Sequence, residues 1–319
     1  MQTLLRSTNA YQLLETERRE NRLSHAYLIL MDDARSLRPA LNVFAKVFFG
    51  VENSQDRIAK LIETESFSDC LFYPKKNKKF AVSDVDEIKE ESVFKPVEGD
   101  KKLFVIGDFA ELLVSSQNKL LKLLEEPPEN VYFLLGATTS YPILQTVLSR
   151  TKKLEIPPFE EREISAFLYR NYPNATDPSK FPTLSAISNG YVGNAQNALE
   201  GGYFDEIVED CFELCLGSKI PVVAKKLNDS KRKKEILSYL RLIFRDALFL
   251  KTGAPTSYLF LKSERERIEK VGSRYALNAL VYAQEGLTNA EKQLKFNTNF
   301  AQCIEILFLN IQNRSKERL

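Results

Sequence analysis

The alternation of short apolar runs with amphipathic stretches in the first half of the chain limits its possible folds most strongly. Five apolar runs of three to six residues have the length and composition of buried strands. They are residues 25–30, 71–73, 102–106, 131–135 and 153–156. Stretches with helical spacing of apolar side chains lie between them, as from Leu37 to Phe48, and Ser83 is the expected N-cap of a helix that runs to about Phe94. Because such alternation builds a mostly parallel sheet covered by helices, residues 1–157 are predicted to form one α/β domain.

Strand-like runs stop at Pro157-Pro158, and only helical patterns follow. Residues 158–203 contain short helical stretches around Gly190 and Gly193, which predicts a small helical domain. Residues 204–319 contain two long stretches with apolar side chains three or four positions apart. The apolar positions are Leu237, Leu240, Phe244 and Leu248 in one, and Phe296, Phe300, Ile304, Leu307 and Ile311 in the other. Long amphipathic helices pack as bundles, so an all-α domain is predicted for 204–319.

The composition favours neither a metal site nor a membrane protein. Cys70, Cys211, Cys215, Cys303 and the single histidine, His25, do not form the tight cluster of a structural zinc site. We therefore expect no metal, and free thiols fit a reducing compartment. The N-terminus lacks a signal-peptide core, and no apolar run approaches the roughly 20 residues of a membrane span. The chain is expected to be cytoplasmic, and its net charge of +2 shows no overall bias toward nucleic acid.

The most specific motif lies within residues 102–159. A predicted strand and helix end in Glu125-Glu126-Pro127-Pro128, and after a further strand comes the pair Ser149-Arg150. This segment resembles the clamp-loader branch of the AAA+ family. Residues 23–28 resemble the strand that leads into the phosphate-binding loop of that family. The resemblance implies an α/β AAA+ domain with a P-loop NTPase-like parallel sheet, a helical lid domain over 158–203 and a helical collar over 204–319.

The resemblance also implies an assembly. Clamp loaders of bacterial DNA polymerase III are heteropentamers of ATPase subunits of the gamma/tau type, a clamp-opening subunit of the delta type and a further subunit. They place a ring-shaped sliding clamp on primer-template DNA. We expect the collar to supply the assembly interface through apolar faces such as that of Phe296 and Phe300, with only weak contact to the clamp. Many relatives have a four-cysteine zinc module, but residues 50–70 here contain only Cys70.

The phosphate-binding loop is degenerate. A P-loop needs two glycines for close backbone approach, a lysine that neutralises phosphate and a hydroxyl residue that binds magnesium. Aligned on residues 25–28, these four positions are held by Met31, Ser36, Leu37 and Arg38. Leu37 cannot neutralise phosphate, and the adjacent Asp32 and Asp33 would repel it.

The other nucleotide-contacting positions also differ from those of active relatives. The acidic pair that follows the strand at 102–106 is replaced by Gly107 and Asp108, so the metal-binding carboxylate is missing. The arginine that reaches the nucleotide from the lid corresponds to Gly193. Loss at three elements predicts a subunit that binds no cofactor and does not hydrolyse ATP.

Arg150 is the predicted functional residue. In clamp loaders, the resemblance implies, the Ser-Arg pair supplies an arginine finger in trans, here Ser149 and Arg150. The permanent charge and planar fork of arginine suit the charge that develops on a γ-phosphate, and such fingers contribute about 10³–10⁵ in rate. Relatives often have cysteine next, whereas this chain has Thr151. The alternative is a surface arginine paired with a carboxylate such as Glu155.

The preferred reading is therefore a non-catalytic stator that donates Arg150 to a neighbouring ATPase subunit. Three alternatives remain open at this point. The chain could be an active AAA+ ATPase subunit with an unusual loop, which hydrolysis by the purified chain would reveal. It could be the clamp-opening subunit, which tight clamp binding by the isolated chain would reveal. It could also be a helical adaptor unrelated to replication.

Overall fold

The chain divides into two compact units, which are described separately here. The computed structural model describes residues 1–51, 53, 55–76, 78–217, 219–230, 232–294 and 298–316. Residues 1–159 and 191–193 form the α/β unit, and residues 160–190 and 194–319 form the helical unit. The first boundary lies close to the predicted one at 157. The helical unit is not divided at residue 203, so the boundary between lid and collar domains stays a prediction.

A five-stranded parallel sheet forms the centre of the α/β unit. Its strands are β1 (Ala26–Leu30), β2 (Cys70–Tyr73), β3 (Lys102–Ile106), β4 (Val131–Ala137) and β5 (Lys152–Glu155). Their order is β2-β3-β4-β1-β5, and every neighbouring pair is parallel. All five strands were predicted, with ends that shift by one or two residues. In the register, Leu28 of β1 lies opposite Leu135 and Lys153.

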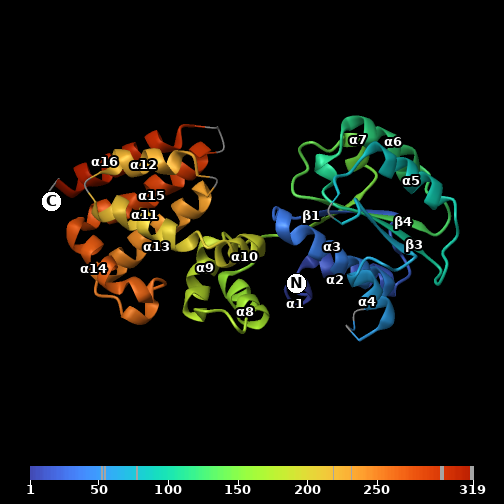
Figure 1. The fold of residues 1–319 in the computed structure, drawn as a ribbon, viewed down its shortest axis with the longest axis horizontal. Helices are drawn as coiled ribbons and strands as arrows, with labels where there is room; N and C mark the ends of the chain where they lie inside the picture. The colour runs from blue at the N-terminus through green and yellow to red at the C-terminus, as the bar shows by residue number, and fades with distance from the viewer. Residues whose placement is uncertain are drawn as a thin grey trace. The chain divides into compact units, whose positions relative to one another are not determined.

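Helices cover both faces of this sheet (Figure 1). They are α1 (Gln2–Leu5), α2 (Asn9–Arg19), α3 (Ala34–Phe49), α4 (Arg57–Glu63), α5 (Val82–Ser92), α6 (Val114–Glu125) and α7 (Gln145–Leu148). Helices α5, α6 and α7 lie on one face, and α2, α3 and α4 on the other (Figure 1). Because successive strand residues point to opposite faces, Leu28 joins the core beneath α5 to α7 together with Phe104 and Phe133, whose rings stack 5.6 Å apart.

One helix start differs from the prediction. Ser83 was expected to cap the helix that begins there, but α5 begins at Val82 with Ala81 as its N-cap. The Asp84 carboxylate accepts a hydrogen bond from the Ala81 N–H at 2.7 Å. The side chain that caps the start of α5 is therefore that of Asp84 in the first turn. The prediction that Ser83 is the N-cap is wrong.

The helical unit contains only helices among its described residues. They are α8 (Glu161–Asn171), α9 (Phe181–Ile187), α10 (Val192–Glu200, which starts in the α/β unit), α11 (Phe204–Leu216), α12 (Ile220–Asn228), α13 (Lys233–Lys251), α14 (Arg265–Arg274), α15 (Leu277–Leu294) and α16 (Phe300–Lys316). Helix α15 packs against α13 and α16. Most of the predicted apolar stripes are buried there, including Phe244 and Ile311, so the expected bundle is confirmed.

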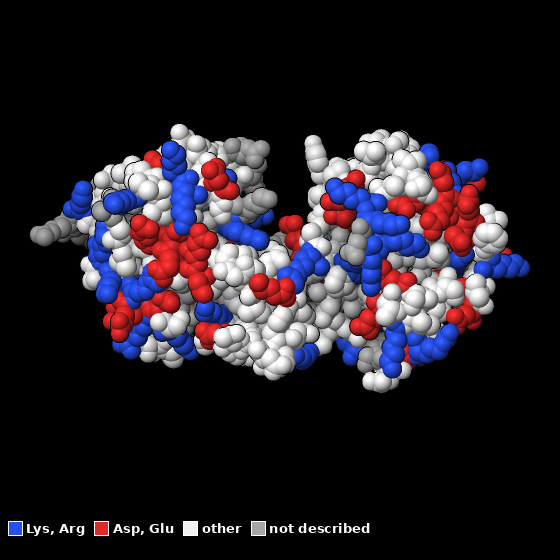
Figure 2. Space-filling view, viewed as in Figure 1, with Lys and Arg blue, Asp and Glu red and all other residues white. Residues whose placement is uncertain are grey.

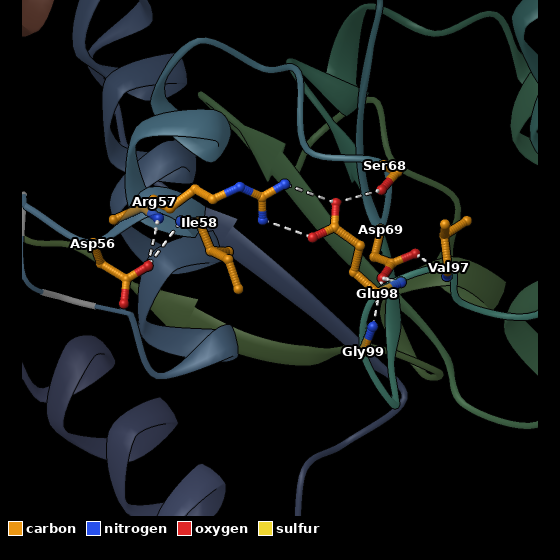
Figure 3. A network of polar contacts seen from close by, with 9 residues as sticks. Asp56, Arg57, Ile58, Ser68, Asp69, Val97, Glu98 and Gly99 are labelled. Atoms are coloured by element: carbon orange, nitrogen blue, oxygen red, sulfur yellow. Dashed lines mark hydrogen bonds and ion pairs between the residues drawn. The ribbon is translucent and has the colours of Figure 1, made fainter.

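A buried carboxylate fixes the chain before β3. Asp69 is fully buried and accepts hydrogen bonds from the backbone N–H groups of Val97, Glu98 and Gly99, at 2.6, 2.8 and 2.9 Å (Figure 3). The Glu98 side chain forms a second, exposed contact with Arg57 at 2.7 Å. Three hydrogen bonds from consecutive backbone N–H groups to one buried carboxylate fix the conformation of residues 97–99 before β3.

We predict that Asp69→Ala destabilises the α/β unit by about 2–4 kcal/mol, because it removes a fully buried carboxylate together with its hydrogen bonds to three backbone N–H groups. The matched control is Arg57→Ala, which breaks only the exposed ion pair in the same network and should cost less than about 1 kcal/mol. Urea unfolding of the whole chain, followed by circular dichroism, measures both. Equal losses for the two variants would contradict the role given to Asp69.

Candidate functional site

The residues predicted to form the degenerate nucleotide site lie at the carboxyl edge of the sheet. Parallel strands place the residues that follow them at one edge, where α/β proteins bind their ligands. Met31 follows β1, Asp108 lies just beyond β3, and Thr138 follows β4. The structure thus brings together the phosphate-loop and acidic-pair positions that the sequence placed in one site, with Thr138 beside Asp108. A cleft of about 820 Å³ opens here, lined by Asp32 and Glu155 as well as Lys153.

Two predicted phosphate-loop positions are part of the hydrophobic core. Met31 and Leu37 are each only 3% exposed. Ser36 is 1% exposed, and its hydroxyl has no hydrogen-bond partner among the described residues. The position where a P-loop lysine would contact phosphate is therefore filled by an apolar side chain that faces other apolar side chains.

The N-terminus of α3, where a P-loop protein holds phosphate, is capped by a carboxylate. Asp33 is 5% exposed and accepts a hydrogen bond from the Ser36 N–H at 3.2 Å. It also accepts one from the N–H of Gly193, which groups with the α/β unit, at 2.7 Å. A Cβ atom at residue 193 would lie 2.1 Å from an Asp33 oxygen, so no larger side chain fits there as the backbone stands. An incoming phosphate would meet a negative charge at this helix end.

Arg38 is bound to other groups. Its Nε and Nη2 donate to the two carboxylate oxygens of Glu65 at 2.7 and 2.5 Å, and Nη2 also donates to the carbonyl of Pro74 at 3.0 Å. The guanidinium carbon lies 5.7 Å from the centre of the Phe72 ring. This cation joins α3 to the segments on either side of β2, so its charge is already balanced by Glu65.

The Asp108 carboxylate, which lies just beyond β3, is hydrogen-bonded to a residue of the protein. The Asp108 carboxylate accepts hydrogen bonds from the N–H and hydroxyl of Thr138 at 3.5 and 3.4 Å. Burial raises the pKa of Asp108 above its ordinary value. The backbone N–H of Gly107 donates to the carbonyl of Tyr73 at 2.7 Å, which continues the pairing of β3 with β2. Asp108 and Thr138 thus form a local contact between the loops after β3 and β4.

Arg150 lies at the opposite edge of the sheet. It follows α7 and precedes β5, while Glu125 ends α6 before β4, so both lie toward the amino ends of strands. Strands of about five residues separate the two edges by roughly 17 Å. Arg150 Nη1 donates to the carbonyl of Thr146 at 2.9 Å and to the hydroxyl of Ser149 at 3.1 Å, and Nη2 lies 2.9 Å from a Glu125 oxygen.

These contacts leave part of the Arg150 fork available. The Arg150 and Glu125 side chains are 35% and 45% exposed. Within the part of the chain that the structure describes, Arg150 Nε makes no hydrogen bond, and Nη2 contacts only Glu125. The structure thus contains the ion pair that the alternative reading expected, with Glu125 as the carboxylate, while Glu155 pairs with Lys153. Sequence reasoning missed Glu125, although it lies in the same motif as Arg150 and the strand order makes their edges adjacent.

His25 connects the elements beside Arg150. Its Nε2 lies 2.9 Å from the carbonyl oxygen of Leu124, and because a carbonyl only accepts, Nε2 carries the proton. The contact ties the start of β1 to the end of α6, where Glu125 follows.

One expectation about the assembly surface is wrong. Phe300 was expected to line an exposed apolar face, but it is fully buried within the helical unit, and Phe296 lies outside the described residues. Apolar side chains are instead exposed at neighbouring turns of α15 and α16. They are Leu277, Val281, Ile306 and Leu309, which are 46–58% exposed. Periodicity identifies an apolar face of a helix, but it does not say whether the chain itself covers that face.

Metal-binding clusters and membrane spans were also sought. No group of three potential metal ligands gathers among the described residues. All four cysteines are buried, and burial raises the pKa of the Cys70 and Cys211 thiols well above the ordinary value. None of the described helices combines the length and apolar character needed to cross a bilayer. On the face drawn in Figure 2, each unit has both basic and acidic side chains.

Comparisons with known sequences point to subunits of DNA polymerase III. The family described as "DNA polymerase III, delta subunit" matches residues 6–160. Subunit delta' of DNA polymerase III from Bacillus subtilis is 24% identical over 330 residues, covering 94% of each chain. Subunit tau/gamma from Haemophilus influenzae is 29% identical over 187 residues, which cover 57% of this chain but 27% of that protein.

Two solved structures align along almost the whole chain. A gamma subunit-related protein from Thermotoga maritima is 17% identical, with a TM-score of 0.40, and covers 95% of this chain and 99% of its own. The Bacillus subtilis clamp loader delta protein is 13% identical, with a TM-score of 0.35, and covers 95% of this chain and 100% of its own.

The burial of Leu37 predicts that restoring the P-loop lysine does not restore a nucleotide site. We expect Leu37→Lys to destabilise the chain by about 3 kcal/mol or more, because its ammonium would enter an apolar core. Leu37→Met keeps the volume and should cost less than about 1.5 kcal/mol. Thermal unfolding measures both, and calorimetry with magnesium-ATP should detect no binding to Leu37→Lys. A stable variant that binds ATP would show that the site is open.

Proposed function

Because this chain belongs to the delta-prime family of DNA polymerase III clamp-loader subunits, we propose that it hydrolyses no ATP itself and lends Arg150 to a neighbouring ATPase subunit. It would act as a rigid stator of a heteropentamer with gamma/tau-type and delta-type subunits. The assembly would open the sliding clamp and place it on primer-template DNA. This chain's own contact with the clamp would be weak.

The closed phosphate site supports the first half of this proposal. Leu37 fills the lysine position, Asp33 caps the helix end that would hold phosphate, and Arg38 is neutralised by Glu65. Each change opposes the binding of a triphosphate for a different physical reason. The first places an apolar side chain where a cation is needed, the second adds a negative charge that repels phosphate, and the third leaves a cation already paired with a carboxylate. No single reversion would remove all three.

The position of Arg150 carries the second half. It lies at the amino edge of the sheet, whereas the remnant of the chain's own nucleotide site lies at the carboxyl edge. A guanidinium at the amino edge cannot serve a nucleotide held at the carboxyl edge of the same sheet. Its partly exposed fork, with Nε free of hydrogen bonds among the described residues, suits a phosphate presented by a neighbouring subunit.

The exposed apolar residues of α15 and α16 support assembly through the collar. Leu277 and Val281 are one turn apart on α15, and Ile306 and Leu309 are one turn apart on α16. These two helices pack against each other. Exposed apolar side chains that lie on packed neighbouring helices are suited to bury against a partner subunit.

The Arg150 proposal is tested in a clamp loader rebuilt from purified subunits. Arg150→Ala should assemble normally and reduce DNA-stimulated ATPase and clamp loading at least tenfold, since an arginine finger contributes about 10³–10⁵ in rate at its site. Arg150→Lys should recover only part of the activity, because lysine keeps the charge but loses the planar fork.

The control for this experiment is Arg162→Ala, an arginine on α8 that is 84% exposed, which should have no effect. Full activity of Arg150→Ala in a correctly assembled loader would refute the donor role. Magnesium-dependent ATP hydrolysis by the purified wild-type chain would refute the non-catalytic role.

The collar proposal has its own test. The double variant Ile306→Asp/Leu309→Asp should fold but fail to co-elute with the other loader subunits in size-exclusion chromatography, because two charges cannot be buried in an apolar interface. Val93→Asp, at a residue that is 78% exposed in the α/β unit, is the control and should assemble normally. Assembly of the double variant with unchanged affinity would contradict this interface.

A further inference from the structure

A second arginine, Arg245, is held rigidly beside a cavity in the helical unit. It lies on α13, and its guanidinium carbon is 4.4 Å from the ring centre of Phe249 and 4.3 Å from that of Phe260. Nη1 donates to the buried Asp246 carboxylate at 3.0 Å. Two aromatic rings and one ion pair therefore fix the plane of the guanidinium, which lowers the entropy lost when it binds a ligand.

The Asp246 carboxylate is hydrogen-bonded to other groups of the protein. It is fully buried and accepts a hydrogen bond from the N–H of Leu261 at 2.8 Å. This contact pins the connection between α13 and α14 onto α13. Burial raises the pKa of Asp246, which agrees with a carboxylate shielded from solvent. Arg245 is 30% exposed, and its Nε and Nη2 have no hydrogen-bond partner among the described residues.

The cavity beside Arg245 has a volume of about 720 Å³, within the range of small-molecule sites. Its polar lining includes Arg245, Lys262, Ser257, Ser263 and Tyr258, and no carboxylate is among its lining residues. Lys262 makes no ion pair, and the hydroxyls of Ser257, Ser263 and Tyr258 make no hydrogen bond, with any residue that the structure describes.

This chemistry selects an anion. A guanidinium fork, an ammonium and serine hydroxyls supply donors in several directions, which suits a tetrahedral phosphate with oxygens on every side. The Tyr258 side chain, 62% exposed, offers an aromatic surface next to these donors. Arg245 shares its charge with Asp246, so the uncompensated positive charge of the cavity comes from Lys262, and an anionic ligand would balance it.

We infer that this cavity is a binding site for a phosphate group, carried by a small organic phosphate or by a nucleic-acid strand. It lies entirely in the helical unit and does not involve the residues proposed for the arginine finger or for assembly. A phosphate here would bridge α13 and the connection that follows it through Arg245 and Lys262.

Inorganic pyrophosphate, AMP and a short single-stranded oligonucleotide are the probes, each titrated into the full chain and followed by calorimetry. We expect pyrophosphate to bind with one site per chain. Lys262→Met should weaken that binding about tenfold, the value of one charge-assisted hydrogen bond. Lys262 is exposed and unpaired, so this variant keeps the fold.

Arg245→Met should abolish binding, with circular dichroism to confirm that the variant is folded. Arg265→Met is the matched control, because Arg265 pairs only with Glu269 on the surface of α14 among the described residues. Competition of AMP with pyrophosphate identifies a free organic phosphate, and competition by the oligonucleotide alone identifies a nucleic-acid strand. Absence of pyrophosphate binding, or binding that Lys262→Met leaves unchanged, would overturn the inference.

Discussion

The parallel direction of all five strands is the constraint on which the rest of the α/β unit depends. The residues that follow β1, β3 and β4 therefore lie at one edge of the sheet. The C-terminal ends of α6 and α7, which precede β4 and β5, lie at the other edge. Because β1 lies between β4 and β5, the segments that precede these three strands are neighbours. The contacts of His25 with Leu124 and of Arg150 with Glu125 follow from that order. The topology thus separates the nucleotide remnant from Arg150.

Internal contacts hold the carboxyl edge of the sheet at the positions predicted for the nucleotide site. In a P-loop, backbone N–H groups at the N-terminus of a helix bind the phosphate of a ligand. Here the Asp33 carboxylate accepts a hydrogen bond at the same end of α3. The buried Leu37 adds apolar packing between α3 and the sheet, and the Arg38–Glu65 pair fixes the connections around β2. Asp33, Leu37 and Arg38 thus stabilise the α/β unit. A functional phosphate-binding loop would instead require glycines and a lysine that has no ion-pair partner within the protein.

The sequence predicted the strands, the bundle and the residues at each edge because these depend on period and order along the chain. It could not predict Glu125 as the partner of Arg150, since that contact depends on which strands are adjacent. It placed Phe300 on an exposed face, whereas the structure buries this ring. Periodicity gives the apolar side of a helix but not what covers it. The Arg245 cavity left no sequence signal, because its residues come from three separate segments.

The ion pair between Arg150 and Glu125 is compatible with the donor role on energetic grounds. Pairs with this degree of exposure contribute about 0–1 kcal/mol, because water and salt screen them. A finger that accelerates phosphoryl transfer by about 10³–10⁵ supplies about 4–7 kcal/mol in the transition state. The contact with a phosphate therefore outweighs the contact with Glu125 several-fold. In the proposed assembly, Glu125 would be too weak a partner to keep Arg150 from a phosphate of the neighbouring subunit.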